Sequence, residues 1–136
     1  MSTRLPLWPL QVALYDHLKA HAATLAYRWQ TEGGAVAALP FYEFGAVTAT
    51  DASTDTGGAG ALVIQLNAWT EIGKGGRKLA QMMMDAALDA LDGVGSLTLA
   101  TGGTALYLGI ADAVLQYDYD EGTAQGSLRL RFNYFG

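Results

Sequence analysis

Leucines recur at roughly helical spacing in residues 9–25, with polar residues between them. These leucines are Leu10, Leu14, Leu18 and Leu25. Pro9 fits the first turn of such a helix, because a residue in that turn needs no intrahelical bond from its N–H. The pattern therefore predicts an amphipathic helix near the start of the chain.

Two strands are predicted in the next part of the chain. Residues 41–50 are rich in aromatic and β-branched side chains, which favour a strand, whereas residues 26–38 indicate no single element. Apolar and polar residues alternate over 61–69, so that one face carries Leu62, Ile64, Leu66 and Ala68 and the other carries Val63, Gln65, Asn67 and Trp69. We expect this second strand to be half-buried. Residues 51–60, rich in Asp, Ser, Thr and Gly, predict the connecting loop.

Residues 77–93 predict a second helix, because Ala, Met and Leu favour helices and Gly93 provides a C-terminal stop. Its polar stripe is narrow and consists of Gln81, Asp85, Asp89 and Asp92. Apolar residues, Met82 among them, occupy most of the remaining circumference. Such a helix is expected to lie between two surfaces, which makes another subunit a candidate for the second.

The C-terminal residues predict a β-hairpin with strands near 111–118 and 127–134. A register with Gln116 opposite Arg129 puts both apolar rows on one face, and shifts by two residues preserve the faces. The polar face then brings two arginines, Arg129 and Arg131, near two aspartates, Asp112 and Asp118. We favour a solvated, charge-paired surface, with an intersubunit contact as the alternative.

Composition narrows the class of protein. The chain has 136 residues, which fit one domain, and neither repeats nor linkers divide residues 1–136. Apolar residues make up 51% and charged residues 15%, so we expect partners to cover part of the surface. No cysteine is present for disulfides or thiolate metal sites, and no apolar run is long enough to span a membrane. The net charge of -5 disfavours binding to nucleic acid phosphates.

The glycine-rich, basic segment from Gly73 to Lys78 resembles a phosphate-binding loop only in composition. A Walker loop needs Ser or Thr after its lysine, but Gly75 follows Lys74. The spacing of the dinucleotide motif is also absent. We interpret the segment as a strand-to-helix turn from which Lys74, Arg77 and Lys78 project, used for connection or protein docking. Anion binding at the helix N-terminus is the alternative.

Other candidate chemistry is sparse. His17 and His21 have metal-ligand spacing, but no third ligand is evident, and a surface pair is the better interpretation. The acidic residues 118–121 lack the calcium-loop pattern and fit a hairpin turn. No serine lies in a Gly-x-Ser-x-Gly motif. We therefore predict no catalytic residue, cofactor or metal.

Several segments in a fixed order carry a family resemblance. They are "LQVALYDHLKAHA", "LPFYEFG", "TATDASTDTGGAG", "ALVIQLNAWT", the glycine-basic turn with its Ala-rich helix, and "GSLRLRFNYF". Together they resemble the tail terminator (tail completion) proteins of long-tailed bacteriophages over nearly the whole chain. The chain departs from the family pattern between Tyr27 and Ala38, where the family has a clearer turn and strand.

The resemblance implies an α+β fold, with two main helices packed on one face of a mostly antiparallel sheet in a single domain. It implies a structural virion protein made in the host cytoplasm and no enzyme: a ring, expected to be hexameric, that terminates the tail tube at its head-proximal end and joins it to the head. The partners implied are further copies, the tail tube protein and a head-completion or connector protein. DNA would pass through without specific binding, and no membrane is involved.

Two alternatives remain beside this function. One is a small enzyme or a ligand- or anion-binding domain that uses the turn from Gly73 to Lys78, and the other is a monomeric adaptor. For the ring, we expect residues 50–60 to dock on a neighbour. The interface residues expected are Asp51, Asp55, Trp69, Lys74, Arg77, Lys78, Met82, Arg129 and Arg131.

Overall fold

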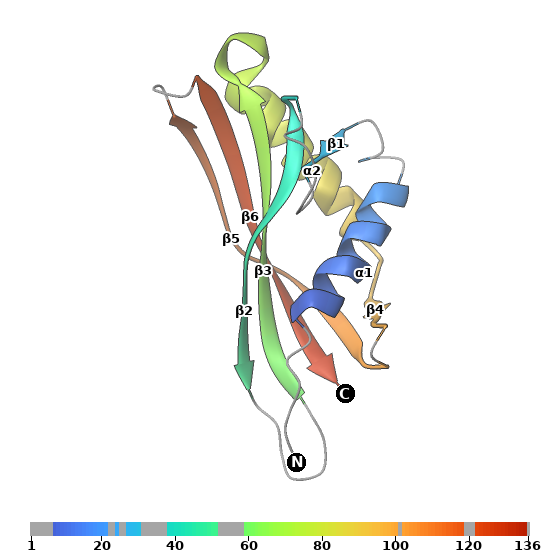
Figure 1. Ribbon diagram of the computed structural model, residues 1–136. Helices are drawn as coiled ribbons and strands as arrows, with labels where there is room; N and C mark the ends of the chain where they lie inside the picture. Colours follow the sequence, from blue (N-terminus) through green and yellow to red (C-terminus); the bar gives the residue numbers. More distant parts are fainter. Residues whose placement is uncertain are drawn as a thin grey trace.

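A computed structural model describes residues 7–21, 24, 27–30, 38–51, 59–100, 102–118 and 122–135. Within these residues the chain forms two α-helices, a short 3-10 helix and six strands (Figure 1). In chain order they are α1 (Leu7–Ala20), β1 (Arg28–Trp29), β2 (Phe41–Asp51), β3 (Ala59–Glu71), η1 (Ile72–Lys74), α2 (Gly76–Leu91), β4 (Ser96–Thr98), β5 (Thr104–Asp118) and β6 (Thr123–Phe135).

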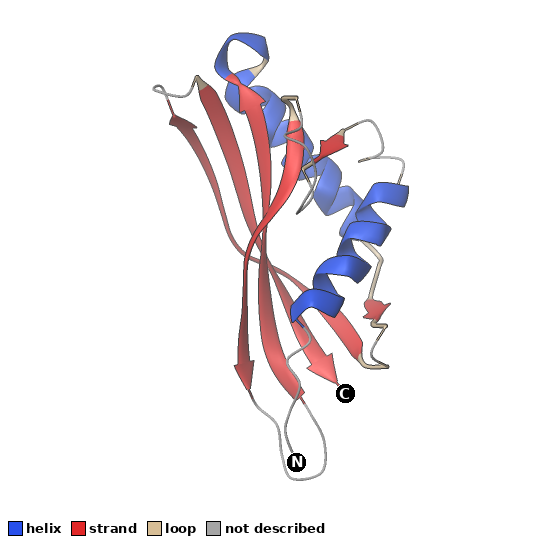
Figure 2. Ribbon diagram, in the orientation of Figure 1, coloured by secondary structure: helices blue, strands red, loops and turns tan. Residues whose placement is uncertain are grey.

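The six strands form one curled sheet in the order β1-β2-β3-β6-β5-β4. All neighbours are antiparallel except β1 and β2. Both α-helices lie on the same side of this sheet and leave its other face open (Figure 2). The predicted α+β class, with two helices on one face of a mostly antiparallel sheet, is confirmed.

The core lies between the helices and the sheet. Leu10, Leu14 and Leu18 of α1 are fully buried, as their spacing predicts. They join the alternate residues of β3 and β6 that point to the helices, namely Leu62, Ile64, Leu66, Ala68, Leu128, Leu130 and Phe132. The sequence patterns therefore identified the inner faces of these elements correctly.

Helix α1 ends at Ala20, earlier than the predicted end at Leu25, which lies outside the described residues. The buried Thr24 hydroxyl donates a hydrogen bond to the Leu18 carbonyl. The His21 N–H, 3.2 Å from the same oxygen, bonds in the tighter pattern typical of a helix end. The Leu18 carbonyl is thus occupied by groups that terminate the helix.

Helix α2 ends at Leu91, and Gly93 follows with a φ of 76°, as expected for a glycine stop. Its predicted polar stripe is exposed. The apolar remainder, however, is mostly covered by the subunit itself, and Met82, 51% exposed, is the one large hydrophobic side chain of α2 that stays open. The apolar part of α2 that another subunit was expected to cover is therefore limited to the surroundings of Met82.

The register of the terminal hairpin differs from the prediction. Gln116 lies opposite Gln125, and Arg129 lies opposite Asp112, so the predicted pair of Gln116 with Arg129 is wrong by four residues. The reason is that β6 begins at Thr123, within the expected turn. Because the shift is an even number, the buried and open faces are unchanged.

Strand β5 is longer than predicted, since it begins at Thr104, and β4 was not foreseen. The ladder between β5 and β6 shifts twice, between Tyr107 and Gly109 and between Ile110 and Asp112. The predicted alternation puts Ala111 and Ala113 on the apolar face of this strand, but both are exposed, and the irregularity at Ala111 interrupts the alternation.

The predicted loop of residues 51–60 is wrong at both ends. Asp51 is the last residue of β2 and pairs with Gly60, and Ala59 begins β3. The strands therefore extend into the polar segment. Residues 52–58, which include Asp55, lie outside the described residues.

Candidate functional site

The turn between β3 and α2 is held by buried bonds. Gly75 has a φ of 112°, and a Cβ there would lie 2.8 Å from the Cβ of Leu79. The fully buried Thr70 hydroxyl donates to the Gly76 carbonyl at 2.7 Å. The Ile72 N–H donates to the Gly122 carbonyl at 2.9 Å. The backbone path of the turn therefore explains Gly75, and Gly76 with its φ of 48°, but does not require a glycine at Gly73.

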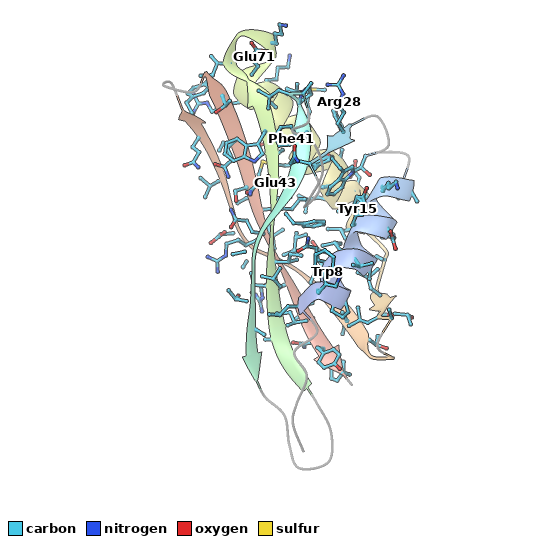
Figure 3. All side chains as sticks on the ribbon, in the orientation of Figure 1. Trp8, Tyr15, Arg28, Phe41, Glu43 and Glu71 are labelled. Atoms are coloured by element: carbon cyan, nitrogen blue, oxygen red, sulfur yellow. The ribbon has the colours of Figure 1, made fainter. Side chains whose placement is uncertain are left out.

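The three cations of this turn are exposed, as predicted, and do not converge on a pocket. Lys74 lies 3.9 Å from the carboxylate of Glu71 at the tip (labelled in Figure 3). The Arg77 guanidinium stacks over the Tyr117 ring, 4.2 Å from its centroid. Lys78 points from the first turn of α2. This geometry fits the connecting role and gives anion binding no support.

The open face of the sheet is a neutral hydrogen-bonded surface centred on Asn67. The Asn67 side-chain oxygen accepts bonds from Gln65, Gln125 and Ser127, at 2.9, 3.1 and 3.0 Å. Although it lies on the face away from the helices, Asn67 is only 5% exposed. Gln116 extends the network to β5 with a 2.7 Å bond to Gln125. The network joins three strands through uncharged groups.

Charged groups lie at the margins of this open face. Arg129 and Asp112 form an ion pair at 3.1 Å, so the polar face carries charge pairing as predicted, although the predicted register had put Gln116 opposite Arg129. The Trp69 indole N–H donates to Glu43 at 3.3 Å. Arg131 is exposed, lies opposite Gly109, and has no carboxylate partner in the described part of the chain.

An aromatic groove of about 510 Å³ lies between α1 and the β1–β2 edge of the sheet. It is lined by Trp8, Gln11, Val12, Tyr15, Trp29, Gln30, Glu43, Phe44 and Gly45. Figure 3 labels Trp8 and Tyr15 on α1 and Glu43 on β2, the two sides of this groove. The ring of Trp29 packs edge-on against Tyr15 at 5.0 Å and lies 5.3 Å from Phe44.

The outer edge of β5 is the second unpartnered apolar region. In the described residues β4 pairs only with Thr104 to Leu106, which leaves the remaining edge of β5 uncovered. Half of the eight large exposed hydrophobic side chains lie on β5, namely Leu106, Leu108, Ile110 and Val114. Long apolar edges of this kind favour pairing with another chain.

His17 joins the two helices and does not form the predicted surface pair. Its Nε2–H donates to the Ala90 carbonyl near the end of α2 at 2.5 Å, and its ring centroid lies 6.1 Å from that of His21. Among the described residues there is no group of three potential metal ligands. In the same part of the chain, no helix is long and apolar enough to cross a membrane.

The predicted interface residues occupy separate regions. Trp69, Arg129 and Arg131 lie on the open face of the sheet, and Lys74, Arg77 and Lys78 lie at the β3–α2 turn. Met82 lies on the exposed side of α2, Asp51 ends β2, and Asp55 is outside the described residues. Sequence reasoning missed the aromatic groove and the β5 edge; the only available signal was Trp8 and Val12, apolar residues outside the leucine stripe of α1.

Comparison with known proteins identifies the family. A chain in the solved structure "Virion of native gene transfer agent (GTA) particle" has 24% sequence identity and a TM-score of 0.73, over 93% of this chain and 95% of that chain, and supports the fold. No curated protein matches the chain. Residues 12–134, most of the sequence, match the family model "Tail completion protein gp17". The resemblance found in the sequence is thereby confirmed, and the protein belongs to the tail completion protein gp17 family.

Proposed function

We propose that this protein is a structural component of a phage or phage-like virion. Several copies, expected to be six, form a ring at the head-proximal end of the tail. The ring terminates the tail tube and joins it to the head. Its partners are further copies of itself, the tail tube protein and a head-completion or connector protein.

The observation that carries the proposal is a pair of sheet edges, in a member of a tail completion family, with which no described residue pairs. One edge is β5 beyond β4, and the other is β2 beyond β1. Because the two edges differ, a contact between them is head-to-tail, and a head-to-tail contact forms a ring of identical subunits when the rotation between neighbours closes. A family likeness to a solved virion chain is consistent with such an assembly.

Surface chemistry suits a channel that DNA crosses without binding. The net charge of -5 disfavours attachment to phosphates. Of the exposed arginines on the open face, Arg129 is neutralised by Asp112. The surrounding network of Asn67 is uncharged. Passage of DNA therefore requires no release of a tight protein–phosphate contact.

The alternative, an anion-binding domain or enzyme using the turn from Gly73 to Lys78, has less support. Lys74 pairs with Glu71, and Arg77 stacks on Tyr117, so neither points into a concave site. The groove of 510 Å³ lies elsewhere, and its described lining contains a single carboxylate, that of Glu43. A paired general acid and base is absent from its lining.

The test is particle assembly in cells that lack this chain. We expect filled heads and separate tails, with joined particles restored when the chain is supplied. A reconstruction of restored particles should show six copies at the head-proximal tail end. Joined particles at normal yield without the chain, or a reconstruction that places it elsewhere, would overturn the proposal.

A further inference from the structure

Strand β5 exposes apolar side chains on the side of the sheet that the helices cover elsewhere. Ile110 and Ala113 lie opposite the buried Leu130 and Leu128, yet both are exposed. The exposure of both side chains shows that no described helix covers them. An outside helix with apolar side chains would complete the packing.

Helix α1 presents such side chains beside the other edge of the sheet. Trp8 is 58% and Val12 36% exposed, and both line the aromatic groove along β2. The buried indole N–H of Trp29, in the same lining, has no acceptor in the described part of the chain. The groove thus combines an unfilled apolar wall with an unsatisfied donor.

The floor of the groove is a strand edge with free backbone groups. The Gln30 N–H donates to the Tyr42 carbonyl at 2.8 Å, so the backbone of Tyr42 points away from β3. In a strand, residues two apart point to the same side, so the N–H and C=O of Phe44 also point outward. β1 pairs only with Phe41 and Tyr42, and no described residue pairs with Phe44 on that side. Such an edge accepts an added strand.

We propose that the β5 edge of one copy occupies the aromatic groove of the next copy, as an added strand beside β2 and under α1. The inference rests on the proposed ring and names the contact that builds it. The two surfaces are complementary. Beyond Leu106, the outer edge of β5 has no strand neighbour and no covering helix among the described residues, and the groove offers both. Because β5 and β2 lie at opposite sides of the sheet, every copy still presents one free edge after binding, until the ring closes.

Charge supports the same pairing. Arg131 has no carboxylate partner in the described residues, and only Gly109, which has no side chain, lies between it and the β5 edge. Among the described residues, Glu43 is the one charged residue that lines the groove. On the open face of a continuous sheet, Arg131 of one copy faces the strand that carries Glu43 of the next.

Cysteine crosslinking tests the contact, because the native chain has no cysteine to interfere. The variants are Val12→Cys, Ile110→Cys and the double variant, each incorporated into assembled particles. Particles are treated with an oxidant, or with a short bismaleimide that bridges thiols too far apart for a disulfide, and then separated under denaturing, non-reducing conditions. We expect a ladder reaching six chains for the double variant and single chains for each single variant.

A matched control replaces Val12→Cys with Asp89→Cys, which is exposed on α2 and belongs neither to the groove lining nor to β5. That double variant should give no ladder. Dimers from Ile110→Cys alone would show pairing between two β5 edges and overturn the inference. Particles with several copies but no crosslinks would overturn this contact while leaving the ring, whereas particles with a single copy would overturn both.

Discussion

Helix α2 packs so closely on β6 at Gly126 that a methyl group there has no room. A Cβ at Gly126 would lie 3.0 Å from Met84 Cγ and still closer to its Sδ. The φ of Gly126 is not positive, so the backbone itself tolerates alanine. We expect Gly126→Ala to cost about 1–3 kcal/mol through overpacking. Without this contact, the change would be neutral or stabilise by about 0.4–1 kcal/mol.

The reasoning is tested by removing the obstructing side chain. Met84 is 4% exposed, so Met84→Ala alone should cost about 2–5 kcal/mol. In the double variant the new methyl group enters the space that the thioether left. The sum of the stability costs of the two single variants should then exceed the cost measured for the double variant by roughly 1–2 kcal/mol, which is within the range for contacting residues.

Urea unfolding of the native chain, the two single variants and the double variant gives the coupling directly. Gly73→Ala serves as a control, since no atom lies within 4 Å of its added Cβ. Costs that add within about 0.5 kcal/mol would refute the close approach of α2 to β6. A Gly126→Ala chain as stable as the native one would do the same.

Three further predictions concern single sites. Burial raises the pKa of the Tyr42 hydroxyl, so the stability that the neutral hydroxyl contributes is complete below its usual pKa of 10.0 and is lost as the pH rises further. Tyr42→Phe should therefore lower the free energy of unfolding by about 1 kcal/mol at neutral pH. The difference between this variant and the native chain in urea unfolding should shrink in alkali. Leu130→Asp buries an unpaired charge and should abolish the circular dichroism spectrum of the folded protein. Arg129→Ala removes an exposed ion pair and should lower the free energy of unfolding by at most about 1 kcal/mol. Equal losses of folded protein in the two variants would show that the faces of β6 are misassigned. Gly75→Ala should lower the melting temperature, because φ is 112° there, whereas Gly73→Ala should not; equal melting temperatures would contradict the described turn.

Periodicity predicted the parts of the fold in which one element buries one face. The leucine stripe of α1 and the alternation of β3 reflect burial directly, so Leu14 and Ile64 were placed correctly. The hairpin register was not predictable in this way, because every even shift gives the same buried face. Strand β4, with only three residues, is too short to show a pattern.

The candidate surfaces were harder to predict because their residues come from distant segments. The aromatic groove joins Trp8 of α1, Trp29 of β1 and Phe44 of β2, and their proximity depends on how α1 packs on the sheet. The exposed edge of β5 follows from the short length of β4 and from two irregularities in the ladder. Charge pairing on the polar face was foreseen because both strands put their arginines and aspartates there, but the partner of Arg129 depends on the register, which was wrong.

The central position of β6 has a consequence for synthesis. β3 pairs with β6 along its whole length, from Ala59 with Phe135 to Glu71 with Thr123, and β5 pairs with β6 on its other side. Every other described element therefore leaves the ribosome before the strand that joins the two halves of the sheet. Until residue 135 has emerged, β3 and β5 each expose a long unpaired edge, which is a state prone to aggregation. Premature termination within β6 should therefore yield insoluble chains rather than a smaller folded subunit.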